Sequence, residues 1–167
     1  MNDVIHREND QAVDQLEALM LEQGELVDCP LVHRFTDGMY VRQIFMPKGT
    51  LITSKIHKTQ HPYTVSLGAV AVSIDGGDWE RIVAPYTGIT NPGTRRILYI
   101  LEDCIWTTYH PLPDMKSEYN DLIDGELDKI LNDIEDKILE PHINKITGSN
   151  ANEDYKKILE TNKNLIL

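Results

Sequence analysis

Histidines in the middle of the sequence have the type and spacing of metal ligands. His57 and His61 lie four residues apart on either side of a short turn, and His110 ends the last apolar run of the same region. Neutral imidazole is the commonest protein ligand for transition metals, and three imidazoles with an open fourth position suit Zn, Fe, Ni or Cu. The alternative is that each histidine is an ordinary hydrogen-bonded residue of a strand end or loop. His33 is a further candidate for the same cluster.

Positively charged side chains in the same region indicate an anion site. If residues 50–57 form a strand, alternation places Lys55 on the same face as His57, and Arg42 lies on the neighbouring strand pattern. An interior that held Lys55, Arg42 and Arg96 would favour a phosphate, carboxylate, sugar or nucleotide ligand, because guanidinium offers a planar fork to two oxygens. The alternative is that these cations point outward and pair with acidic residues, at a gain of about 0 to 1 kcal/mol each.

Other motifs give weaker indications of function. Aromatic residues that could stack on a base or sugar ring more often form the core, and they are Trp79, Trp106, Tyr40, Tyr63, Tyr86, Tyr99 and Tyr109. The sequence has no glycine-rich phosphate loop, nucleophile elbow or Ser/His/Asp order, so hydrolase and nucleotide-hydrolysing functions have no support.

The composition narrows the class of protein. The 167 residues include 27 acidic and 16 basic side chains, a net charge of -11, which disfavours general nucleic-acid binding. The adjacent pair Arg95 and Arg96 could still bind one small anion. Cys29 and Cys104 show neither a disulfide framework nor a zinc-knuckle spacing. With no signal-peptide pattern and no apolar run of about 18 residues, we expect a cytoplasmic protein with no membrane partner.

The elements that must position these residues are mostly short strands. Runs of β-branched and aromatic residues begin at Leu31 and are broken by turn signals at 36–38, 47–49, 75–78 and 91–93. They predict seven or eight antiparallel strands in a sandwich, jelly roll or barrel. The runs are residues 40–46, 50–57, 63–67, 69–74, 80–85, 95–101 and 104–110. Glu102 and Asp103 predict an acidic turn between the last two strands.

Helices are predicted on both sides of these strands. Residues 9–23 have an apolar stripe at helical spacing, with Asp10 as the cap and Gly24 at the end. A second stripe runs from Ile123 to Ile138, and it packs either on its own barrel or on a partner subunit. Its acidic face predicts a solvated surface. Residues 147–152 predict a flexible connector and 154–160 a weak final helix.

From Gly49 onward the sequence resembles the cupin family. The first cupin motif is matched in spacing by Gly49, then Lys55 and His57 two residues apart, then His61 in the glutamate position, and Gly68. The second motif is matched at Asn91-Pro92-Gly93, with Arg96 where a histidine would sit. The resemblance covers residues 31–111 and extends to small cupin-like proteins of unassigned function from tailed phages and prophages. In a cupin-like barrel, His110 would return beside the start of the strand that carries His61.

The departures from the motif change the expected chemistry. Lys55 and Arg96 stand where cupins place metal ligands, and both would repel a divalent cation at neutral pH. The usual centre of three histidines and one glutamate is therefore absent. What stays open is a centre of His57, His61 and His110, loaded with Zn, Fe, Ni or Mn.

These observations together predict a mainly β, cupin-like jelly-roll barrel at 29–113, an N-terminal helical segment at 1–28 and a C-terminal helical extension at 114–167. We expect a homo-oligomer that binds a small polar or anionic ligand through Lys55, His57, His61, Arg96, His110 and Arg42. The alternatives are a metal-dependent isomerase or oxygenase, and a structural or accessory phage protein acting in the host cytoplasm.

Overall fold

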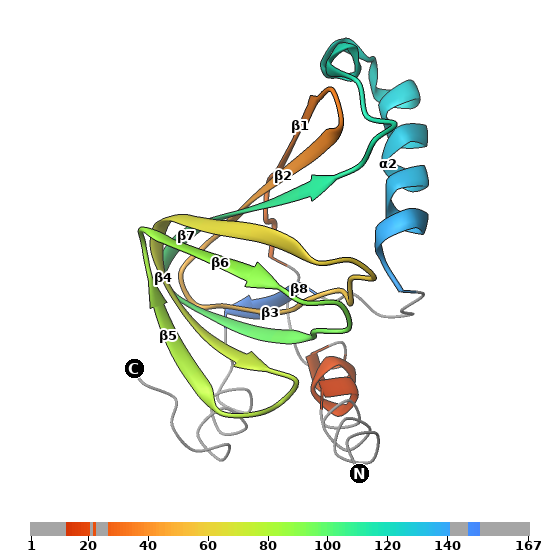
Figure 1. Cartoon of the computed structure of the whole chain (residues 1–167). Helices are drawn as coiled ribbons and strands as arrows, with labels where there is room; N and C mark the ends of the chain where they lie inside the picture. Colours follow the sequence, from red (N-terminus) through yellow and green to blue (C-terminus); the bar gives the residue numbers. More distant parts are fainter. Residues whose placement is uncertain (1–12, 21, 23–26, 141–146, 151–167) are drawn as a thin grey trace.

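The computed structural model describes residues 13–20, 22, 27–140 and 147–150, and this part of the chain is mainly β (Figure 1). The strands are β1 (Leu31–Thr36), β2 (Met39–Met46), β3 (Thr50–Thr53), β4 (His61–Ile74), β5 (Trp79–Val83), β6 (Tyr86–Thr90), β7 (Arg96–Pro111) and β8 (Thr147–Asn150). A 3-10 helix, η1 (Ser117–Asp121), precedes the helix α2 (Asp124–Ile138). An N-terminal helix is described over residues 13–20. The predicted fold class, an antiparallel β barrel with a helix at each end, is confirmed.

All strand pairs are antiparallel, and two long strands join the barrel together. The sheet runs β1-β2-β7-β3-β8, and β4 pairs with β5, β6 and β7. The C-terminal half of β7 pairs with β2, and its N-terminal half pairs with β3. One strand thus carries residues to both sides of the barrel.

The length of these strands corrects several predictions. The two runs predicted for residues 63–74 form the single strand β4, and those predicted for 95–110 form β7. Glu102 and Asp103 therefore lie within a strand and form no turn; the register shifts between β4 and β7 in this region absorb the bend. In the other direction, the strand predicted for 50–57 ends at Thr53, and β6 was not predicted.

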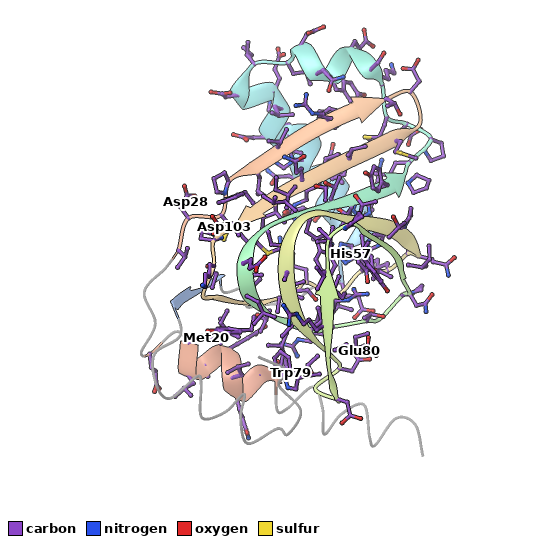
Figure 2. The ribbon with its side chains drawn as sticks, turned by 90° about the vertical axis from the view of Figure 1, so that its left-hand side faces the viewer. Met20, Asp28, His57, Trp79, Glu80 and Asp103 are labelled. Atoms are coloured by element: carbon purple, nitrogen blue, oxygen red, sulfur yellow. The ribbon has the colours of Figure 1, made fainter. Side chains whose placement is uncertain are left out.

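The N-terminal helix closes one end of the barrel. Its residues Val13, Leu16 and Met20 are buried against Leu51 and Trp79, and Figure 2 shows Met20 and Trp79 together at this end. This burial is what the apolar stripe predicts. The predicted cap at Asp10 and end at Gly24 lie outside the described residues.

The helix α2 packs on its own barrel, which decides between the two predicted roles of its stripe. Ile134 and Ile138 are buried with Phe35, Tyr40 and Met115, and Figure 1 shows α2 beside β1, β2 and the end of β7. Ile123, at the start of the stripe, stays 71% exposed. The stripe is therefore largely used within the chain.

The C-terminal region departs from its prediction where it is described. Residues 147–150 form β8, which pairs with β3, so the flexible connector predicted for 147–152 is wrong over this part. The predicted final helix at 154–160 lies outside the described residues. No helix in the described ranges is long and apolar enough to cross a membrane.

Candidate functional site

A cavity of about 620 Å³ lies between the barrel and α2. Its walls come from β1, β2, β3 and the segment after it, the first residue of β4, the last residue of β6, both halves of β7, and one face of α2. Strand alternation explains which residues reach it, because every second side chain of a strand faces the same side. On β2 these are Tyr40, Arg42, Ile44 and Met46, and on β7 they include Trp106, Thr108 and His110.

Strand register brings His61 beside His110. Tyr63 of β4 is paired with Thr108 of β7. Because the strands are antiparallel, His61, two residues before Tyr63, lies opposite His110, two residues after Thr108, on the same face. Their ring centroids are 4.4 Å apart. Tyr40 of β2 is paired with His110 from the other side, and the two rings stack.

His57 reaches the same point from an irregular segment, because β3 ends four residues earlier. The backbone of this segment is held by the C-terminal end of α2: the amide of Lys58 donates to the carbonyl of Ile138, and the amide of Glu140 donates to the carbonyl of Ile56. On the other side, the Gly93 amide donates to the carbonyl of His57. Contacts distant in sequence therefore position this histidine.

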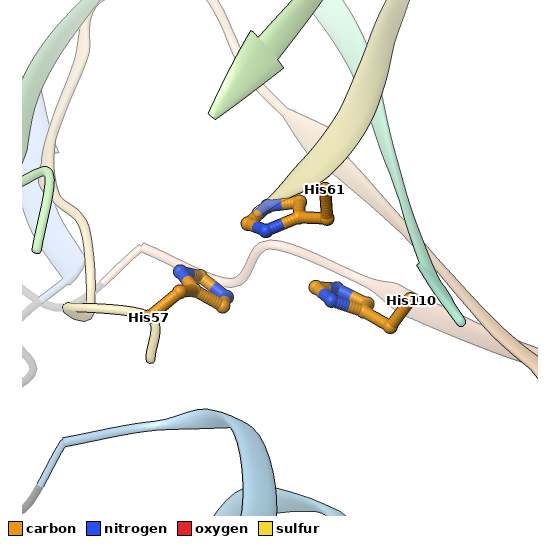
Figure 3. A group of neighbouring side chains, drawn as sticks. All are labelled: His57, His61 and His110. Carbon is orange, nitrogen blue, oxygen red and sulfur yellow. The ribbon is translucent and has the colours of Figure 1, made fainter. Parts of the chain in front are cut away.

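The three imidazoles face one another, as Figure 3 shows. One nitrogen from each of His57, His61 and His110 lies within 4.8 Å of the others. His61 and His110 are buried, with 2% and 1% exposure, and His57 is half-buried. We call this group the histidine triad.

Hydrogen bonds leave one nitrogen of His61 and one of His110 available. Nδ1 of His61 lies 3.2 Å from the carbonyl oxygen of Thr59, to which it can donate, and its Nε2 is then a free acceptor. Nε2 of His110 lies 2.8 Å from the hydroxyl of Thr108. Nδ1 of His110 is buried and has no hydrogen-bond partner among the described residues.

Burial keeps the triad neutral at physiological pH. It is the main cause that lowers the pKa of His57 to about 2 and that of His110 to about 3. The proximity of His61 and of Arg42 lowers both pKa values further, and His110 and Arg96 also lower that of His57. Burial also lowers the pKa of His61, while its contact with the Thr59 carbonyl opposes the shift. Neutral imidazole is the form that binds a metal. The unpartnered Nδ1 of His110 and the convergence of the triad both fit a transition-metal ion.

Arg96 enters the cavity beside the triad. Its side chain is buried, its Nη1 donates to the hydroxyl of Thr90 at 3.0 Å, and its guanidinium lies over Tyr63, 5.1 Å from the ring centroid. Tyr63 in turn stacks on Trp106 at 4.4 Å. No carboxylate among the described residues forms an ion pair with Arg96, and its Nε is buried without a hydrogen-bond partner there.

Arg42 lines the cavity from β2, where it is paired with Thr108. It forms neither a hydrogen bond nor an ion pair with any residue that the structure describes. Burial lowers its pKa, but an arginine retains its charge at any physiological pH. Two guanidinium groups therefore share the cavity in a protein of strongly negative net charge.

Other cations that the sequence singled out have partners. Nζ of Lys55 lies 3.0 Å from Oε1 of Glu135 on α2, at the edge of the cavity, and with β3 ending at Thr53 it does not share a strand face with His57. Arg95 points away from the cavity and pairs with Asp14 and Glu17 of the N-terminal helix. Of the two adjacent arginines, only Arg96 lines the cavity.

His33 lines the cavity but lies outside the triad. Its Nδ1 is 2.6 Å from the hydroxyl of Tyr40. Tyr40 thus stands between His33 and His110, in ring contact with both.

Sequence reasoning missed the contribution of α2. Asp128 and Glu135 belong to the acidic face that was predicted to be a solvated surface, and together with Asn132 they line the exposed rim of the cavity. The apolar stripe pointed to the packing of α2 on the barrel, but nothing in the sequence indicated which acidic residues would then meet the rim.

Comparisons with known proteins give similarities in fold. No family model matches the chain, and no curated protein matches it. Solved structures that it resembles include the cupin domain of Cnp3 from Schizosaccharomyces pombe, with 13% identity over 55% of this chain and 66% of that one, at a TM-score of 0.44. KdgF from Halomonas sp. has 14% identity over 53% and 87%, at 0.41. Ectoine synthase from P. lautus has 12% identity over 58% and 73%, at 0.46.

Proposed function

We propose that the protein binds a small anionic ligand in the cavity between the barrel and α2. The observation that carries the proposal is Arg96, a 7% exposed guanidinium that faces the cavity without a carboxylate partner among the described residues. A buried charge is costly unless a group of opposite charge compensates it. An anionic ligand supplies that compensation.

The surroundings of Arg96 hold its guanidinium in place before the ligand arrives. Thr90 takes one hydrogen bond from Nη1, and the stacked rings of Tyr63 and Trp106 lie beneath the plane. Such a group loses little conformational entropy on binding, which favours affinity. A carboxylate or phosphate can accept two parallel hydrogen bonds from a guanidinium.

The second candidate function is that of a metal-dependent enzyme, and the histidine triad favours it. His57, His61 and His110 would hold the ion, and Zn, Fe, Ni or Mn bound there would supply Lewis-acid or redox chemistry. The residues of this chain would do the rest: Thr108 orients His110, the Thr59 carbonyl orients His61, and Arg96 positions an anionic group beside the triad.

Isothermal titration calorimetry with acetate and inorganic phosphate tests the anion site. We expect the Arg96→Gln variant to lose at least tenfold in affinity, since a hydrogen bond to a charged group is worth about 1.5 to 3 kcal/mol. Arg34→Gln is the matched control, because Arg34 is exposed on β1 and does not line the cavity. Equal affinity of the Arg96→Gln variant and the wild type would refute the proposal.

Metal analysis of the same samples separates the two candidates. If a metal is resident, the variants His57→Ala, His61→Ala and His110→Ala lose it, and Arg96→Gln keeps it. A homo-oligomer, a cytoplasmic location and the role of a structural or accessory phage protein stay predictions, and the last depends on the sequence resemblance alone.

A further inference from the structure

The two arginines of the cavity approach the histidine triad from different sides. Arg42 on β2 is paired with Thr108 and lies next to the Tyr40–His110 pair. Arg96 bonds to Thr90, whose strand partner is His61. The electrostatics agree: Arg42 lowers the pKa of His110, Arg96 lowers that of His61, and both lower that of His57.

Neither positive charge is neutralised by the described residues. The carboxylate of Glu135 raises the pKa of Arg42. However, Oε1 of Glu135 lies 3.0 Å from Nζ of Lys55, with which it forms an ion pair. The Arg96 guanidinium contacts the Thr90 hydroxyl and the rings of Tyr63 and Trp106. Burial lowers its pKa, and the Tyr63 side chain and Asp75 oppose this shift. Asp75 forms no ion pair with Arg96 among the described residues, and Oδ1 of Asp75 accepts a hydrogen bond from the Arg95 amide. Two like charges in one sheltered cavity also repel each other, which raises the cost of leaving both unpaired.

The surface around these charged groups is apolar. Ile44, Met46, Ile52, Leu98 and Trp106 line the cavity together with the triad and the arginines. A carbon chain fits such a lining better than a second charged or strongly hydrated group would. The cavity thus offers two positions for anionic groups and apolar contacts for what joins them.

We propose that the ligand is a small dianion, with one anionic group at Arg96, the other at Arg42, and a short carbon chain between them beside the triad. The inference rests on the proposed anion-binding function and adds the second group. Its class is a dicarboxylate or a carboxylate joined to a phosphate. One molecule that satisfies both arginines binds more tightly than two separate anions, because the second contact is intramolecular.

A matched series of probes tests the second anionic group. Calorimetry at fixed ionic strength would compare butyrate, succinate, glutarate and 3-phosphonopropionate, of which butyrate carries one anionic group and the others two. We expect the best dianion to bind at least tenfold more tightly than butyrate. We also expect Arg42→Gln to remove most of this advantage, so that its affinity for the dianions approaches its affinity for butyrate. Arg34→Gln should bind every probe as the wild type does.

The outcomes distinguish the two proposals. If butyrate binds as tightly as every dianion, or Arg42→Gln weakens butyrate and the dianions equally, the second anionic group is wrong. The anion-binding function then still stands, provided that Arg96→Gln weakens butyrate. If no probe binds the wild type, or Arg96→Gln binds all probes unchanged, both proposals fail.

Preference for succinate or for 3-phosphonopropionate identifies the second group as carboxylate or phosphate. Should Arg42→Gln fail to fold, as judged by circular dichroism, Arg42→Met takes its place.

Discussion

Nε2 of His110 lies 2.8 Å from the hydroxyl oxygen of Thr108, two residues earlier on the same strand. If Nε2 carries the proton and donates to this hydroxyl, the lone pair is on Nδ1, the nitrogen that is buried without a partner in the described structure. In this tautomer the hydrogen bond to Thr108 leaves Nδ1 of His110 as the nitrogen that can bind a metal.

Removal of this hydroxyl is expected to weaken metal binding. Groups that hydrogen-bond to a ligating histidine typically contribute 10- to 100-fold in metal affinity, so we expect Thr108→Val to lose about that much. Competition titration of Zn²⁺ or Co²⁺ against a chelator measures it. Thr87→Val, at an exposed position of β6, is the control. Equal affinity in both variants would show that the hydroxyl does not orient a ligand.

The depressed pKa values predict that the metal-free protein loses stability in mild acid. The pKa values of His57 and His110 are about 2 and about 3 in the fold, against about 6.5 in the unfolded chain. Between these values the unfolded chain binds more protons, so stability is full above pH 6.5 and falls as the pH falls toward 3. Each histidine adds at most about 1.4 kcal/mol per pH unit to this slope.

Urea denaturation of metal-free protein at pH 7, 6 and 5 measures this dependence. The double variant His57→Gln, His110→Gln should show a flatter decline in the free energy of unfolding than the wild type. Carboxylates titrate equally in both proteins and cancel in the difference. Parallel curves would mean that the two histidines do not titrate with lowered pKa values.

Gly88 of β6 leaves space for the ring on which Arg96 lies. A Cβ at this position would come within 2.6 Å of the Tyr63 ring, which is fixed by its stacking on Trp106. We expect Gly88→Ala to cost about 1 to 3 kcal/mol in stability, as overpacking does, and to weaken anion binding together with it. Gly125→Ala is the contrasting variant, because a Cβ there meets nothing within 4 Å in the first turn of α2, and it should stabilise by about 0.5 to 1 kcal/mol. Thermal unfolding and calorimetry report both effects; a Gly88→Ala variant of unchanged stability would contradict the packing argument.

Local patterns in the sequence were sufficient for the fold class and for part of the site. Turn signals and period-two alternation act within a few residues, and they predicted an antiparallel sandwich, jelly roll or barrel with a helix at each end. Strand alternation also separates Arg95 from Arg96, since adjacent residues face opposite sides. The proximity of His61 and His110 required an assumed barrel, which came from the family resemblance.

The predictions that failed concern residues whose structure is decided by contacts between distant segments. Residues 54–57 have strand-like composition, and Ser54 still bonds to Arg96 of β7. Ile56 and His57 instead pair with Glu140 and Leu139, just after α2, so Lys55 does not follow the alternation of β3. Its partner Glu135 is 80 residues away. Glu102 and Asp103 look like a turn because acidic residues are common in turns, yet β7 continues through them.

Arg96 and His110 lie 14 positions apart on one continuous strand, and their positions share a parity. Apart from the exposed Glu102, even-numbered residues of β7 face the interior, among them Leu98, Ile100, Cys104 and Trp106. Ile97 packs with the N-terminal helix on the other side. Deleting or inserting a single residue near Glu102 would leave two usable half-strands but would turn Arg96 and His110 to opposite faces. Length changes of two residues there would keep both side chains in one cavity, so the bend tolerates insertions in pairs and not singly.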